Sequence, residues 1–117
     1  MNTYLLEGEL PGEALFERLA REDPGSLIQI LKGDLSTGFL THAAEIAGRD
    51  LPGDVIVPTL LGLLTHPSAL MREGVIYGLS HHPSATVKQA LEKLAAEDPS
   101  PGIREAAAGV PSDYEEK

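Results

Sequence analysis

The chain contains no cysteine and no tryptophan, and its phenyl and phenol rings come from only two phenylalanines and three tyrosines. The absence of cysteine excludes a disulfide framework, a thiolate nucleophile and a cysteine-type zinc site. With so few rings, the core must be built from Leu, Ala, Ile and Val, a composition that favours packed helices. At 117 residues and 42% apolar content, the chain is long enough for one domain with one core.

Long apolar runs are missing as well. The longest mostly apolar run, residues 55–64, contains Pro58 and is far shorter than the roughly 20 residues that a membrane-spanning helix needs. The beginning of the chain has neither a basic n-region nor an apolar stretch of signal-peptide length. We therefore expect a cytoplasmic protein that does not enter a membrane.

Positive charge is scarce: nine Lys and Arg stand against 18 Asp and Glu, which gives a net charge of −9. Because each phosphate contact needs a cation that this chain is short of, direct nucleic-acid binding is not expected. A basic protein partner fits this charge better. The competing explanation is that the charge only maintains solubility.

What the sequence does contain is a repeat. The phrase "ERLAREDP" at residues 17–24 returns as "EKLAAEDP" at residues 92–99, and a wider pattern has a period of 32 residues. Three segments align without gaps, beginning at Asp34, His66 and Asp98. The positions that coincide are Ser36, Ser68 and Ser100; Phe39, Met71 and Ile103; Ala43, Val75 and Ala107; and Ala44, Ile76 and Ala108. The apolar members of this set lie at i, i+4 and i+5, which is one face of a helix.

Each repeated unit is predicted to be a helix pair, because a second aliphatic stretch with helical spacing precedes each aligned segment. One pair cannot bury its apolar face alone, so a period in this range indicates a stack of pairs, a solenoid. The proline in each "EDP" ends a helix because it lacks an amide hydrogen. Seven helices are predicted, at residues 11–22, 26–33, 37–48, 54–65, 69–80, 84–97 and 101–109. Leu60, Leu63, Val75 and Ile76 are expected to be buried between units.

Residues 55–80 resemble the short bacterial HEAT-like repeat that is also found in phycobilisome-lyase proteins. That repeat has an early proline, a D-P-x-x-x-V-R turn and an Ala-rich second helix. The resemblance implies an all-α, right-handed α-solenoid of about three HEAT-like helix pairs plus an N-terminal capping helix. Its expected divisions are an N-terminal segment with the capping helix at 1–25, repeats at 26–50, 51–82 and 83–111, and a short acidic tail at 112–117. The matching repeat positions are Pro58, Pro67, Arg72, Asp98, Pro99 and Arg104.

The repeated arginines have two interpretations. Arg72 and Arg104 could form a ligand-binding ladder on the inner face. Proteins of the family that this chain resembles use the arginine structurally, so that each one caps a helix or pairs with an acidic residue such as Asp98. We favour the structural role. Ser68 and Ser100 stand at helix starts, where N-capping is a sufficient explanation for a hydroxyl.

No catalytic or metal-binding constellation stands out. His42, His66, His81 and His82 are the only histidines, and none is followed by the Glu of the iron-binding His-Glu dipeptides of HEAT-like deoxyhypusine hydroxylases. We expect no metal, no cofactor and no enzymatic activity. The alternative is a lyase-like or hydroxylase-like HEAT enzyme that retains a cofactor or metal site.

The remaining candidate is a binding surface. In the family that this chain resembles, the second helix of each pair lines a concave face, and the register places a set of acidic, aromatic and histidine residues there. The expected contact residues are Thr41, His42, Glu45, Glu73, Tyr77, His81 and Glu105, with Arg49 and His82 near the edges. The sequence thus predicts a protein-binding module with an acidic concave face, either an inhibitor or immunity-type protein for a basic partner or an adaptor. Self-association through the short final helix, "GIREAAAG", is a further expectation.

Overall fold

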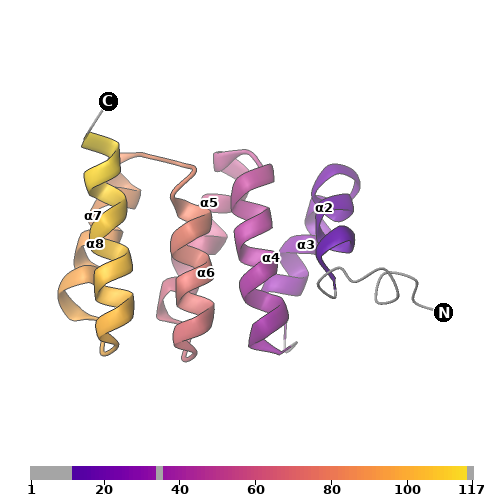
Figure 1. Ribbon diagram of the computed structural model, residues 1–117. Coiled ribbons are helices and arrows are strands. Elements are labelled where there is room, and N and C mark those ends of the chain that lie inside the picture. The colour runs from indigo at the N-terminus through magenta and orange to yellow at the C-terminus, as the bar shows by residue number, and fades with distance from the viewer. Residues whose placement is uncertain (1–11, 34–35, 116–117) are drawn as a thin grey trace.

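The computed structural model describes the backbone of residues 12–33 and 36–115, and side chains up to residue 110. Helix is the only regular secondary structure in these residues, and the helices stack as an α-solenoid (Figure 1). The helices are α2 (Glu13–Glu22), α3 (Pro24–Leu31), α4 (Thr37–Asp50), α5 (Gly53–Gly62) with the 3₁₀ turn η1 (Leu63–Thr65), α6 (Ala69–Leu79), α7 (Ala85–Glu97) and α8 (Pro101–Glu115). The predicted solenoid of helix pairs is confirmed.

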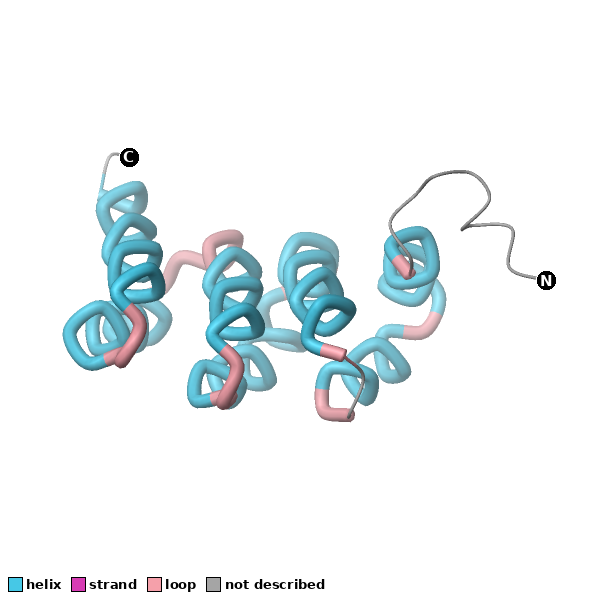
Figure 2. The backbone as a smooth tube through the Cα atoms, turned by 60° about the horizontal axis from the view of Figure 1, so that its bottom comes forward, coloured by secondary structure: helices cyan, strands magenta, loops and turns pink. Residues whose placement is uncertain are grey.

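The helices form two layers. Helices α4, α6 and α8 lie side by side in one layer with α2 beside α4, and α3, α5 and α7 lie behind them (Figure 1). Figure 2 shows the same two layers after a turn that brings the bottom of the molecule forward. Each unit is therefore one helix from the rear layer followed by one from the front layer, which we call the second helix. The second helices are α4, α6 and α8.

The helix boundaries follow the capping and proline residues of the sequence, except at the end of the last helix. Ser68 begins α6 as expected, since its hydroxyl accepts a hydrogen bond from the Met71 amide at 3.3 Å. The prediction that the last helix ends at residue 109 is wrong: α8 runs to Glu115, so residues 112–115 continue the helix and are not a separate tail. Pro111 removes one backbone hydrogen bond but does not end the helix, just as Pro58 lies inside α5. The predicted tail residues 116–117 and the predicted helix start at residue 11 lie outside the described residues.

The core lies between the layers and is aliphatic, as the composition requires. Leu60, Val75 and Ile76 are fully buried, which confirms three of the four expected core positions. Leu63 is only half-buried, and Leu64 takes the core position. The reason is that α5 gives way to a 3₁₀ turn at Leu63, and the tighter winding changes the direction in which successive side chains point.

Helices α4 and α6 approach each other at backbone contact distance because both carry glycine where they meet. A Cβ atom added to Gly48 would collide with the backbone of Gly78. A Cβ atom on Gly78 would lie 2.7 Å from the carbonyl oxygen of Ala44, and one on Gly74 would overlap Thr41. No side chain separates the two helices at these points, so their relative position is fixed by the backbones themselves.

Candidate functional site

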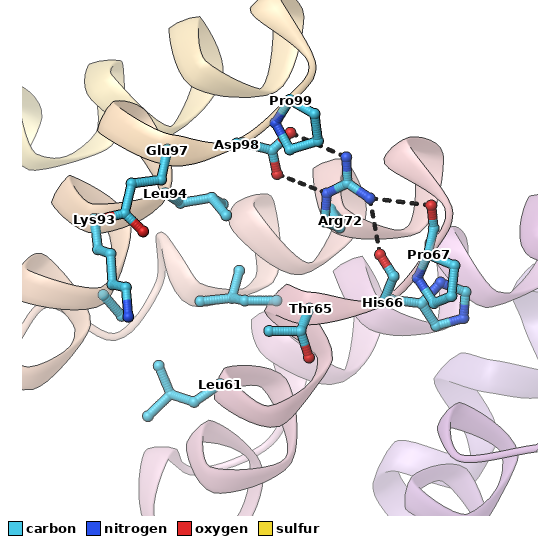
Figure 3. Close-up of a pocket in the computed structure, with 12 residues that line it drawn as sticks. Leu61, Thr65, His66, Pro67, Arg72, Lys93, Leu94, Glu97, Asp98 and Pro99 are labelled. Carbon is cyan, nitrogen blue, oxygen red and sulfur yellow. Dashed lines mark hydrogen bonds and ion pairs between the residues drawn. The ribbon is translucent and has the colours of Figure 1, made fainter.

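The second and third units are joined by a buried ion pair between Arg72 of α6 and Asp98, which precedes α8 (Figure 3). Arg72 Nε donates to Asp98 Oδ2 at 2.7 Å and Nη2 donates to Oδ1 at 3.0 Å. Arg72 Nη1 also donates to the carbonyl oxygens of His66 and Pro67, at 2.8 and 3.1 Å. The guanidinium therefore stabilises the turn that precedes α6 and links it to the turn that precedes α8. These contacts are consistent with the structural interpretation of the repeated arginine.

Arg104 forms the same bond to the turn before its own helix that Arg72 forms to the His66 carbonyl oxygen. Its Nη1 donates to the carbonyl oxygen of Asp98 at 2.7 Å, and the Ser100 amide donates to Asp98 Oδ1 at 2.9 Å. Burial alone would raise the pKa of Asp98. The hydrogen bonds from Arg72 and Ser100, together with the charges of Arg72 and Arg104, outweigh burial and leave the pKa of Asp98 below its ordinary value.

Beside this ion pair, a groove of about 560 Å³ runs between α5 with η1 and α7 (Figure 3). Leu61, Leu64 and Leu94 line it, and the Arg72–Asp98 pair closes one end. The groove presents a largely apolar surface, although Lys93 and Glu97 of α7 also line it. It lies beside the rear-layer helices, away from the predicted contact residues.

The predicted contact residues fall mostly on the front of the second helices. Tyr77 is 45% exposed and Glu105 is exposed, while Glu45 and Glu73 are half-buried. We call the surface that comprises His42, Glu45, Glu73, Tyr77 and Glu105 the second-helix face.

Thr41 does not belong to this face, and its prediction as a contact residue is wrong. Its side chain is only 6% exposed, and its hydroxyl donates to the carbonyl oxygen of Leu70 at 2.9 Å. The cause is the close approach of α6 at Gly74, which covers Thr41.

Arg49, expected near the edge of the face, is held by two carboxylates. Its Nη2 donates to Glu17 Oε2 of α2 at 2.9 Å and its Nε donates to Asp50 Oδ1 at 2.7 Å. Hydrogen bonds from Arg49 lower the pKa of Asp50, and those to Asp50 and Glu17 raise the pKa of Arg49. This arginine therefore ties the capping helix to the first unit.

The histidines have separate surroundings. His66 Nδ1 accepts a hydrogen bond from the Ser68 amide at 3.0 Å, and His82 Nε2–H donates to the carbonyl oxygen of Gly48 at 2.7 Å. His82 thus supports the end of α4 and does not stand free at the edge of the face. His42 Nδ1 lies 3.8 Å from Glu45 Oε1, and His81 is exposed. Among the side chains of residues 12–33 and 36–110, no three His, Cys, Asp or Glu form a group that could hold a metal ion.

A smaller pocket lies at the junction of α2, α4 and α6, and we call it the junction pocket. Its volume is about 310 Å³. The lining residues are Glu13, His42, Glu45, Ile46, Arg49, Tyr77 and His81. The structure thus brings four of the predicted contact residues together around one hollow: His42, Glu45, Tyr77 and His81.

Glu13 and Leu70 were missed by the sequence analysis. Glu13 is in the first turn of α2, and only the packing of α2 against α4 brings it to the pocket. Leu70 is 46% exposed near the start of α6, one turn before Glu73. The repeat did offer a signal for Leu70, since its aligned positions are the glycines Gly38 and Gly102 and a leucine there is unexpected.

This architecture defines a class: an α-solenoid of stacked helix pairs whose second helices present a continuous face. The family model for HEAT repeats matches residues 14–110, and the chain therefore belongs to the HEAT repeat family. Comparison with curated proteins finds no match, and comparison with solved structures finds none either. Among the helices that the structure describes, none has the length and apolar character needed to cross a membrane.

Proposed function

We propose that this chain is a non-catalytic protein-binding module that captures a basic partner on the second-helix face. HEAT repeats are commonly protein-interaction modules, which supports the binding role. One observation supports the charge of the partner: in the described part of the chain, Glu45, Glu73 and Glu105 form no ion pair with lysine or arginine.

The arginines of the same helices are already engaged and do not neutralise these carboxylates. Arg49 bonds Glu17 and Asp50, Arg72 bonds Asp98, and Arg104 bonds the Asp98 carbonyl oxygen. A net charge of −9 adds long-range attraction, which speeds the association of oppositely charged proteins. Fast capture suits an inhibitor or immunity-type protein that covers a cationic surface, and we favour this role over that of an adaptor.

The test is the association rate with the partner captured from the native host, measured at low and at high ionic strength. Glu73→Lys and Glu105→Lys are compared with Glu92→Lys, which makes the same charge change at an exposed position of α7, in the rear layer. Charge reversal on the second-helix face should slow association more than charge reversal at Glu92. High ionic strength should slow association of the wild-type chain. If neither salt nor the face variants change the rate, the electrostatic capture is refuted. If Glu92→Lys slows association equally, only net charge matters and the face is not the site.

Self-association through α8 stays a prediction. Ala108 and Gly109 are exposed, whereas Ala44, the counterpart of Ala108, is buried against α6. Light scattering of the purified chain tests it directly, and a monomer at all concentrations would contradict it.

A further inference from the structure

We propose that the junction pocket receives one cationic side chain of the partner, and that it selects arginine over lysine. This inference rests on the proposed function, since it specifies which chemical group of a basic partner the second-helix face recognises. Three features carry it: the size of the pocket, the surfaces that line it, and the balance of charge around it.

The size limits the occupant. A hollow of about 310 Å³ is at the lower end of the range for ligand sites, large enough for one long side chain but too small for a folded segment. It is formed by three helices: the glycine contacts join α4 to α6, and the Arg49–Glu17 ion pair joins α4 to α2. The pocket therefore exists before a partner arrives.

The lining suits an arginine. Ile46, only 5% exposed, and the half-exposed ring of Tyr77 supply the apolar and aromatic surfaces. A guanidinium is planar and weakly hydrated, so it stacks on an aromatic ring while its alkyl stem covers apolar surface. An ammonium group is more strongly hydrated and gains less from the same surroundings.

The charge balance is negative. Glu13 comes to the pocket from α2 and Glu45 from α4, and neither pairs with a lysine or arginine in the described part of the chain. Arg49 also lines the pocket, but its charge is opposed by the carboxylates of Glu17 and Asp50. Two carboxylates that lack a lysine or arginine partner, beside an aromatic ring, suit a guanidinium, whose N–H groups form charge-assisted hydrogen bonds with carboxylate oxygens.

The experiment uses the ¹⁵N-labelled full chain and small neutral-ended probes: Nα-acetyl-argininamide, Nα-acetyl-lysinamide and Nα-acetyl-citrullinamide. Citrulline keeps the shape of arginine without its charge. Chemical shifts are followed during titration at pH 7.5 and low salt. We expect saturable shifts at the amides around the junction pocket with the arginine probe, with an affinity at least about threefold above that of the lysine probe. The citrulline probe should cause no saturable shift.

Variants locate the site. Glu45→Gln and Tyr77→Leu should each weaken arginine binding by about two- to fivefold, the range expected for one exposed cation–π or charge contact. Glu92→Gln, at an exposed position of α7 in the rear layer and outside the second-helix face, is the matched control and should leave the affinity unchanged. Thermal unfolding of each variant checks that the fold is retained.

Three outcomes would overturn the proposal: equal binding of the arginine and citrulline probes, shifts that do not saturate, or equal loss from Glu92→Gln and Glu45→Gln. The two proposals can fail separately. A partner whose association still slows with salt and with Glu73→Lys, together with no probe binding, refutes the arginine pocket and leaves the binding face intact. If the arginine probe binds but the association rate of the partner depends on neither salt nor Glu73→Lys, electrostatic capture is refuted and the arginine pocket stands.

Discussion

Breaking the Arg72–Asp98 ion pair should destabilise the whole solenoid far more than breaking an exposed ion pair. The perturbations are Asp98→Asn, which removes the charge but keeps the shape and an acceptor for the Ser100 amide, and Arg72→Met, which keeps the length of the side chain. Each variant leaves the other charged group buried without its partner. The side chains of Arg72 and Asp98 are 9% and 2% exposed, so water cannot replace the lost contacts.

The expected magnitude follows from this burial. Removing one partner of a buried pair costs about 3–5 kcal/mol, because an uncompensated charge remains in the interior. A domain of this length has a free energy of unfolding of roughly 6–18 kcal/mol, so the variants should fold but lose a large part of their stability. The double variant leaves no buried charge, and it should cost less than the sum of the single variants by about 1–3 kcal/mol. Arg49→Met, which breaks the exposed pair with Glu17, should cost no more than about 1 kcal/mol.

Urea unfolding followed by circular dichroism measures all of these variants. With a urea dependence of about 2 kcal/mol/M, a loss of 3–5 kcal/mol moves the midpoint by roughly 1.5–2.5 M. The reasoning would be refuted if Arg72→Met cost no more than Arg49→Met. It would also be refuted if the single costs were additive, since additivity means that the two side chains do not stabilise each other.

Three further predictions use the same assay. Gly48→Ala should lose about 1–3 kcal/mol by overpacking against the α6 backbone, whereas Gly62→Ala, with open space around it, should gain up to about 1 kcal/mol from helix propensity; a gain at both sites would contradict the backbone contact. Because the folded-state pKa of Asp98 is lowered, its stabilisation is present above the unfolded value of about 3.9 and is lost as the pH falls through the folded value. Stability should therefore decline below about pH 4, and less steeply in Asp98→Asn. Leu60→Ala should cost about 2–5 kcal/mol and the half-buried Leu63→Ala clearly less, with equal costs contradicting the structure.

The period of 32 residues was sufficient to predict the order of the helices, because the helix pair recurs in every unit. The structural role of Arg72 came from the resemblance to the HEAT-like repeat, since the aligned residue of the first unit is Leu40. It could not predict how closely two neighbouring units approach. Thr41, Glu73 and Glu105 occupy equivalent positions, yet Thr41 is buried, Glu73 is half-buried and Glu105 is exposed. The difference depends on which residues of the neighbouring helix pack against each position. An alignment of the repeats does not show which residues those are.

The partners of these positions explain the difference. Gly74 and Gly78 of α6 let that helix reach the backbone of α4, whereas the corresponding residues of α8 are Ala106 and Val110, which carry side chains. The close contact of α4 with α6 and the wider spacing between α6 and α8 therefore follow from the sequence, once it is known which residues of neighbouring helices face each other. The junction pocket could not be predicted for a related reason: Glu13 lies outside the three aligned segments, so no register connects it to Glu45.

The first and second units are joined by a different kind of contact from the second and third units. This difference determines which part of the second-helix face should move when the Arg72–Asp98 ion pair is lost. Between α4 and α6, the contact is backbone against backbone at Gly48 and Gly78, and it offers no alternative arrangement of side chains. Between the second and third units, the contact includes the buried Arg72–Asp98 pair, and a groove lies open beside it. The junction pocket is built across the first joint and should keep its shape, whereas the spacing of Glu73 and Glu105 spans the second. Loss of the ion pair should consequently change partner capture through Glu105 while arginine binding at the junction pocket persists, provided that the variant is measured under conditions where it is folded.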